Sequence, residues 1–160
     1  MSVYSALRAA LLIGAAAFAV NVQAQSASPL QLHSDVKVDK IVTADGQAKH
    51  VLSDPEVVVP GDRLLFRTEY RNTGAQEVTD FVVTNPLPQG VALDPGAKAP
   101  AEVSIDGGVT WGGLATLSVK DAATGSERPA QLSDVTHVRW VLKSVKPGEN
   151  GEVTFNAIVR

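Results

Sequence analysis

Histidines and carboxylates are the residues of this chain that could carry acid–base or metal chemistry, and their spacing favours neither. His33, His50 and His137 lie far apart and lack the H-x-x-x-H spacing with which two imidazoles bind one metal ion. We therefore interpret them as exposed strand or loop residues. Four acidic residues are the candidates for a calcium site, although no D-x-D-x-D-G loop accompanies them. These four are Asp94, Asp106, Asp121 and Glu149.

Nucleophilic and phosphate-binding motifs are absent from the sequence. There is no G-x-S-x-G elbow, no P-loop and no dinucleotide-binding fingerprint, and no serine has a His–Asp partner at a recognised spacing. The sequence therefore predicts no catalytic, cofactor-binding or metal-ligating residue and no cofactor. We expect a protein that is not an enzyme.

Residues 104–111 read Ser-Ile-Asp-Gly-Gly-Val-Thr-Trp and follow the pattern S-x-D-x-G-x-T-W. This pattern resembles the Asp-box of sialidase-type β-propellers. The resemblance implies a structural hairpin, in which Asp106 binds the amides of the turn and Trp111 packs beneath it. A propeller would repeat the pattern in every blade, whereas here it occurs once. We therefore expect a stabilised turn and no sialidase chemistry.

The first 24 residues have the order of a secretory signal peptide. A basic start with Arg8 precedes an apolar run over residues 9–20, and Val22-Gln23-Ala24 forms a small-residue cleavage site. A run of this length is shorter than the roughly 20 residues of a membrane helix. We expect export to the periplasm or the cell exterior, cleavage after Ala24 and no membrane span afterwards; a retained anchor is the alternative. Residues 25–34 are small and polar and predict a flexible leader.

The net charge limits the classes of binding partner, and the absence of cysteine limits what can stabilise the fold. The chain has 14 basic and 17 acidic residues, and loss of Arg8 with the signal peptide brings the net charge to about −4. Scattered positive charges on an acidic chain argue against nucleic acid and against anionic membrane surfaces. With no cysteine, an exported domain has no disulfides and depends on buried apolar area.

Residues 57–74 and 81–88 contain the clearest strand signals. Leu64, Phe66, Thr68 and Tyr70 fall on one face of an expected strand, a period of two that indicates a half-buried antiparallel strand. The opposite face carries Arg67, Glu69 and Arg71, which we interpret as a solvated sheet surface rather than a binding patch. A turn at residues 72–74 leads to the second strand.

Short strands separated by turn signals continue along residues 35–160. We expect strands near residues 35–43, 49–53, 101–105, 109–111, 114–120, 135–142 and 152–160, with a polar loop at 121–133. Seven to nine such strands in one domain predict an all-β, immunoglobulin-like antiparallel β-sandwich. Five aromatic side chains are expected between its sheets, namely Phe66, Tyr70, Phe81, Trp140 and Phe155.

Several turn motifs also occur in a family order. They are Val59-Pro60-Gly61-Asp62, Tyr70-Arg71-Asn72-Thr73-Gly74 and Val83-Thr84-Asn85-Pro86-Leu87-Pro88. Later come Val138-Arg139-Trp140 and Lys146-Pro147-Gly148-Glu149. Together they resemble the conserved-repeat family known as domain of unknown function eleven, with Asn85 where that family usually has Asp. The resemblance implies an immunoglobulin-like β-sandwich of bacterial and archaeal surface and secreted proteins, without catalytic residues.

The function expected from the sequence is protein–protein contact in the cell envelope or outside the cell. Partners would be other envelope or surface proteins or further copies of the chain, as in a surface or filament subunit. In one version, residues 25–34 donate a strand to a neighbour. The alternative is a carbohydrate-binding module, in which Trp111 or Tyr70 is the stacking platform.

Overall fold

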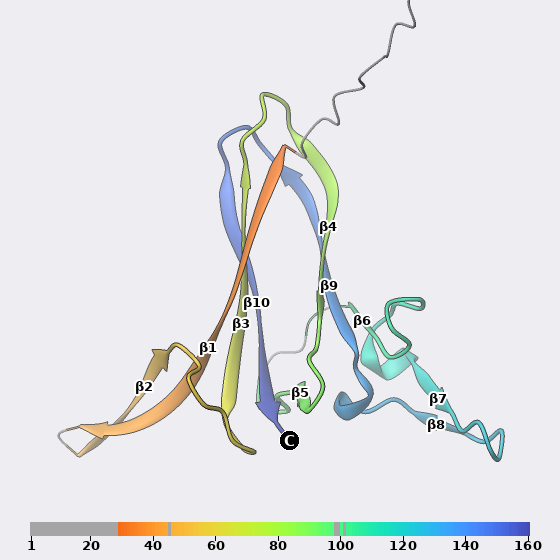
Figure 1. Cartoon of the computed structure of the whole chain (residues 1–160). Helices are drawn as coiled ribbons and strands as arrows, with labels where there is room; N and C mark the ends of the chain where they lie inside the picture. The colour runs from red at the N-terminus through yellow and green to blue at the C-terminus, as the bar shows by residue number, and fades with distance from the viewer. Residues whose placement is uncertain (1–28, 45, 98–99, 101) are drawn as a thin grey trace, which may run out of the picture.

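The computed structural model describes residues 29–44, 46–97, 100 and 102–160, and in this part of the chain the protein is all-β with antiparallel sheets. The predicted signal peptide, residues 1–24, and residues 25–28 of the predicted leader lie outside the described residues. Two facing layers form the body of the molecule, and one short hairpin projects from each side of its lower end (Figure 1).

The larger sheet has five strands in the order β2-β1-β3-β10-β5. These are β1 (Leu30–Ala44), β2 (Gln47–Ser53), β3 (Arg63–Asn72), β5 (Val91–Leu93) and β10 (Asn150–Val159). The central strand β3 pairs with β1 on one side and with β10 on the other.

The second layer is a three-stranded sheet in the order β4-β9-β6. Its strands are β4 (Val78–Pro86), β6 (Glu102–Ser104) and β9 (His137–Val145). A separate hairpin pairs β7 (Ser118–Lys120) with β8 (Glu127–Pro129), and two 3-10 turns flank it, η1 (Leu114–Thr116) and η2 (Leu132–Asp134).

The core lies between the two sheets, as the alternation predicts. Phe155 is fully buried and stacks on Phe66, with 4.6 Å between the ring centroids. The Trp140 ring lies on Phe155 as well, with 6.0 Å between their centroids. The other two expected aromatic residues, Phe81 and Tyr70, are outside this cluster. Aliphatic side chains fill most of the remaining space. Those that are buried in the cluster are Val38, Leu64, Val91, Leu93, Val103, Val135, Val138 and Ala157.

Four boundaries differ from the prediction. The expected strand 114–120 begins with the 3-10 turn η1, and only β7 is extended. Residues 30–34 belong to β1 rather than to a flexible leader, because they pair with β3 from Leu30↔Asn72 onward and Leu30 is buried. Residues 109–111 form no strand, since the turn that precedes them is longer than a tight hairpin. The expected loop 121–133 contains β8 and most of η2. Ten strands therefore replace the expected seven to nine within the described residues.

The buried amide of Asn72 joins three segments at the upper end of the sandwich. Its Nδ2 donates to the carbonyl oxygens of Gln76 and Val145, both at 2.8 Å, and its Oδ1 accepts from the Gly74 amide at 2.9 Å. Its main chain bonds the β9–β10 turn at Gly148 and Glu149. The motif residue predicted to form a turn thus also holds the two sheets together.

A second polar link crosses the interior between the sheets. Asn85 on β4 donates from Nδ2 to Thr68 Oγ1 on β3 at 2.8 Å, and Thr68 in turn bonds Ser34 on β1 at 2.9 Å. Thr68 is fully buried. Because each of these groups has a partner, the polar row is compatible with the apolar core around it.

Candidate functional site

One hairpin of the larger sheet projects from the body of the molecule and is largely exposed. It consists of Val38–Ala44 of β1 paired with β2, in a register that runs from Val38↔Ser53 to Ala44↔Gln47. We call these two segments the arm. Strand β3 pairs with β1 only as far as Asp39, so the remainder of the arm extends past the sheet (Figure 1). All seven residues of β2 are exposed.

Exposed apolar side chains are concentrated on the arm and on the segment that follows it. The described part of the chain has eleven exposed large hydrophobic residues, and seven of them lie within residues 41–59. We call these seven the apolar arm surface: Ile41, Val42, Val51, Leu52, Val57, Val58 and Val59. Single exposed hydrophobic residues are ordinary, whereas several within one short stretch of chain favour an interaction site.

Both faces of the arm carry apolar side chains. Since side chains alternate along a strand, Val42 and Val51 lie on the face that continues the core side of β1. Ile41 and Leu52 lie on the opposite face. Two adjacent apolar residues in a strand lie on opposite faces, so the pairs Ile41-Val42 and Val51-Leu52 in the sequence indicate that both faces are apolar. A half-buried strand would alternate apolar with polar residues instead.

The charges of the arm are divided between its faces. His50 lies beside Asp39, with 2.9 Å between Nδ1 and Oδ1, on the face of Ile41. Lys40 and Lys49 lie on the face of Val42 and Val51, and no ion pair holds either lysine within the described residues. This face is therefore both apolar and basic.

The outer face of the larger sheet is an internally paired charge network. Arg67 donates from Nε and one terminal nitrogen to the two carboxylate oxygens of Asp35, at 2.9 and 3.0 Å. Its other nitrogen lies 3.5 Å from Glu69 and 3.9 Å from Glu152. The hydrogen bond from Arg67 holds the pKa of Asp35 below its usual value. These charges pair with one another, whereas Arg71, the third residue of the predicted stripe, lines the groove described next.

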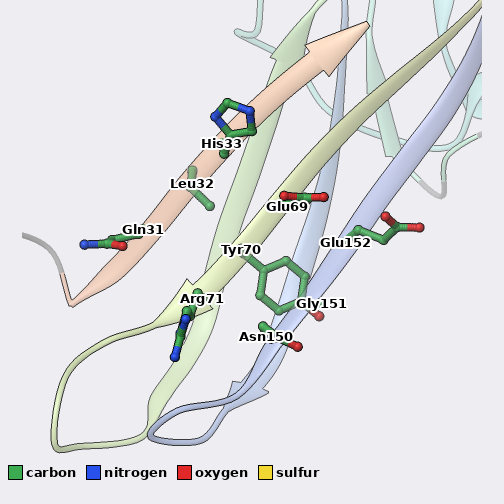
Figure 2. Close-up of a pocket in the computed structure, with 9 residues that line it drawn as sticks. All are labelled: Gln31, Leu32, His33, Glu69, Tyr70, Arg71, Asn150, Gly151 and Glu152. Carbon is green, nitrogen blue, oxygen red and sulfur yellow. The ribbon is translucent and has the colours of Figure 1, made fainter. Parts of the chain in front are cut away.

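A shallow groove of about 550 Å³ crosses β1, β3 and β10 near the upper end of the sandwich. Figure 2 shows its lining residues on these three strands, with the Tyr70 ring beside Gly151. A side chain at position 151 would displace the tyrosine, since a Cβ there would lie 2.6 Å from the Tyr70 ring. Leu32 is the one aliphatic side chain among the residues that line the groove, and it is half exposed.

Residues 104–111 form the stabilised turn that the Asp-box pattern predicts. Asp106 Oδ1 accepts from the amides of Val109 and Thr110, at 3.1 and 2.9 Å, and from Ser104 Oγ at 2.7 Å. These donors favour the ionised carboxylate and lower the pKa of Asp106 to about 2. One oxygen of the carboxylate accepts all three of these bonds, which gives Asp106 a structural role in the turn.

Trp111 lies against its own protein rather than open to solvent on both faces. The Arg139 guanidinium is 4.5 Å from the ring centroid, and Arg139 is in turn bonded to Glu102 at 2.7 Å. The indole Nε1 donates to the Gly108 carbonyl at 2.8 Å. The ring face that Arg139 covers is closed to a sugar, and Tyr70 is the expected platform residue that lines a groove.

The histidines and the four candidate calcium ligands do not converge. His33, His50 and His137 lie on β1, β2 and β9, and no three His, Asp or Glu side chains of the described residues form a metal-binding group. The acidic residues have separate roles. Asp94 pairs with Arg63, Asp121 accepts the amides of Ala123 and Thr124, and Glu149 accepts the Lys146 amide.

Comparison with known proteins adds no relative. No family model matches the chain, and no curated protein and no solved structure matches it. Within the described residues, no helix has the length and hydrophobicity to cross a membrane. The arm is thus the feature of the molecule on which a functional assignment rests.

Proposed function

We propose that this chain is an exported, non-enzymatic β-sandwich module that acts by protein–protein contact in the cell envelope or outside the cell. The apolar arm surface is the observation that carries the proposal. Four large apolar residues on the projecting arm, and three more on the segment that follows it, are costly in water unless a partner covers them. The partner is another surface protein or a further copy of the chain.

The arrangement of the strands supports immunoglobulin-like layering for the body of the module, with a different connectivity. Constant-type immunoglobulin domains have the spatial orders ABED and CFG. If β1, β3, β4 and β5 are taken as A to D, the two sheets here have the same spatial orders. The strands β6, β9 and β10 then occupy the places of G, F and E, so the chain fills these three places in the reverse of the immunoglobulin order. We propose that the chain is related to the domain of unknown function eleven. The shared turn motifs and the two-layered arrangement of the sheets support this relationship.

Photo-crosslinking in living cells tests the proposed contact. A benzophenone amino acid replaces Val51, which is 43% exposed on the arm, and in a matched variant it replaces Val109, which is 82% exposed outside the arm. We expect a covalent adduct from position 51 and none from position 109. Absence of an adduct at 51, or equal labelling at both positions, would refute the role of the arm.

Export is tested on the same cells. Amino-terminal sequencing of the chain recovered from the periplasm and the medium should begin at Gln25. A chain that retains Met1 in the cytoplasm would contradict the proposed location.

A further inference from the structure

The free edge of β2 directs main-chain hydrogen-bonding groups to solvent. Two residues connect the paired Ala44 and Gln47, a connection in which the closing pair exchanges both of its hydrogen bonds. Bonded and non-bonded pairs alternate along an antiparallel ladder. The amide and carbonyl groups of Ala48, His50 and Leu52 therefore point away from β1, toward the open edge of the arm.

Other edges of the sheets are less open to a partner. Residues 31–37 of β1 pair with β3 on one side only. A further strand on their other side would meet the end of β2, where Ser53 pairs with Val38. On β4, Asp80 has a φ of 49°, a left-handed conformation that disturbs the edge, and the strand ends at Pro86. Strands β5, β6, β7 and β8 have three residues each. Of the edges in the described residues, β2 combines length, regularity and projection (Figure 1).

The sequence of β2 is compatible with itself in one symmetric register. A two-fold axis at His50, the midpoint of the seven residues, places Ala48 opposite Leu52 and Lys49 opposite Val51 of the second copy. No lysine then faces a lysine directly. Ala48, His50 and Leu52 meet one another as bonded pairs, which gives six main-chain hydrogen bonds in three rows.

The cross-strand neighbours within the arm extend this pattern over four strands. Lys40 pairs with Val51, and Val42 pairs with Lys49. In the symmetric register one row reads Lys40 and Val51 of one copy, then Lys49 and Val42 of the other, and the next row is its reverse. Lysine and valine alternate in both directions, so the aliphatic part of each lysine lies over a valine while its ammonium group stays in water.

We propose that two copies of this chain associate through their arms, with β2 paired antiparallel to β2 about a two-fold axis at His50. An isolated two-stranded hairpin is marginal in water, whereas the pairing converts two projecting hairpins into one four-stranded ribbon. Closed two-fold contacts of this self-complementary type are the commonest form of assembly in soluble proteins. The inference rests on the proposed function, since it names a second copy as the partner of the arm.

A cysteine substitution tests the axis directly, because the natural chain contains no cysteine. In the purified exported chain, His50→Cys brings two sulfur atoms together across the axis, at a Cα separation of about 5.5 Å that a disulfide can span. Ile41→Cys is the matched control, since Ile41 is the cross-strand neighbour of His50 and 60% exposed but lies one strand further from the axis. We expect disulfide dimers to form at least about tenfold faster at position 50. Equal rates would overturn the proposal.

A proline substitution tests the main-chain pairing separately from the side chains. The amide of residue 50 points to the open edge, so His50→Pro removes no main-chain hydrogen bond within the arm and is compatible with an edge strand. It does remove the side-chain contact of His50 with Asp39, a loss that the control His50→Thr shares. It also removes two bonds across the axis, which we expect to raise the dimer dissociation constant about thirtyfold. The control His50→Thr should leave it nearly unchanged. Both variants should retain the wild-type circular dichroism and melting temperature, and equal dissociation constants for the two would overturn the proposal.

The outcomes separate this inference from the proposed function. An adduct at Val51 whose mass equals two copies of the chain supports both. An adduct with a different protein, together with a His50→Cys chain that stays monomeric on oxidation, overturns the two-fold pairing and leaves the contact function supported. Absence of any adduct at Val51 refutes both.

Discussion

Replacement of Asn72 by alanine should destabilise the fold more than any other single change in the turn motifs. The Asn72 side chain is completely buried and makes three hydrogen bonds, two as donor and one as acceptor. These bonds connect β3, the β3–β4 loop and the end of β9. The substitution therefore removes the link between the two sheets at the upper end of the sandwich.

The magnitude follows from the partners that are left behind. Each hydrogen bond contributes about 1 kcal/mol net, and a buried partner without a bond costs about 1–3 kcal/mol. The Val145 carbonyl is in a buried environment, whereas the Gln76 carbonyl and the Gly74 amide are only partly buried and can bind water. We expect a loss of about 3–4 kcal/mol in the free energy of unfolding. For a domain of this size the melting temperature should fall by roughly 10–15 °C.

Urea unfolding followed by tryptophan fluorescence measures this loss. The matched control is Thr73→Ala, which removes a hydrogen bond from an exposed hydroxyl to the Pro29 carbonyl in the same motif and should cost less than about 1 kcal/mol. Asn72→Asp has the same shape but replaces the donor by an oxygen that faces two carbonyl oxygens. It should be at least as unstable as Asn72→Ala at pH 7. If Asn72→Ala unfolds at the urea concentration of Thr73→Ala, the reasoning is wrong.

Three further predictions concern the core, the Asp-box turn and the groove. Phe155→Ala should cost about 3–5 kcal/mol in urea unfolding, because the ring is buried and stacked on Phe66; a loss below about 1 kcal/mol would show that the sheets do not meet there. Asp106 has a pKa lowered from 3.8 to about 2, so its stabilising effect is complete above pH 4 and is lost as the pH falls through 2. Asp106→Asn should therefore lower the melting temperature at pH 7, and its melting temperature should decrease less than that of the wild type between pH 4 and pH 2. An equal decrease in the two proteins would contradict this. Gly151→Ala should destabilise the wild type but have little effect in a Tyr70→Ala background, since the added Cβ meets the Tyr70 ring; a thermodynamic cycle with no coupling would exclude that contact.

The body of the fold could be predicted because its strands are half buried. Alternation placed Leu64, Thr68 and Phe155 inward, and all three are buried in the structure. The Asp-box turn was predictable for a local reason, since Asp106 bonds amides within four residues of itself. Signals of this kind depend on neighbours in the sequence or on one apolar face.

The arm and the polar links between sheets were not predictable on the same grounds. Ile41-Val42 and Val51-Leu52 place apolar side chains on both faces, a pattern that suggests burial in a single chain, whereas these residues are exposed. Residues 30–34 appeared too polar for a strand, although pairing with β3 holds them in the sheet. The bond from Asn85 to Thr68 joins residues 17 apart on different sheets, and it follows from the packing of the layers rather than from either segment.

Amide hydrogen exchange on β2 tests most directly whether the arm is an interface. The purified exported chain is exchanged across a range of protein concentrations, and the amides of Ala48, His50 and Leu52 are compared with those of Lys49 and Val51, which face β1. The paired arm predicts that the first three become protected as concentration rises, while the other two are protected throughout. If Ala48, His50 and Leu52 exchange at the rate of an unprotected peptide at every concentration, the pairing of this edge is contradicted.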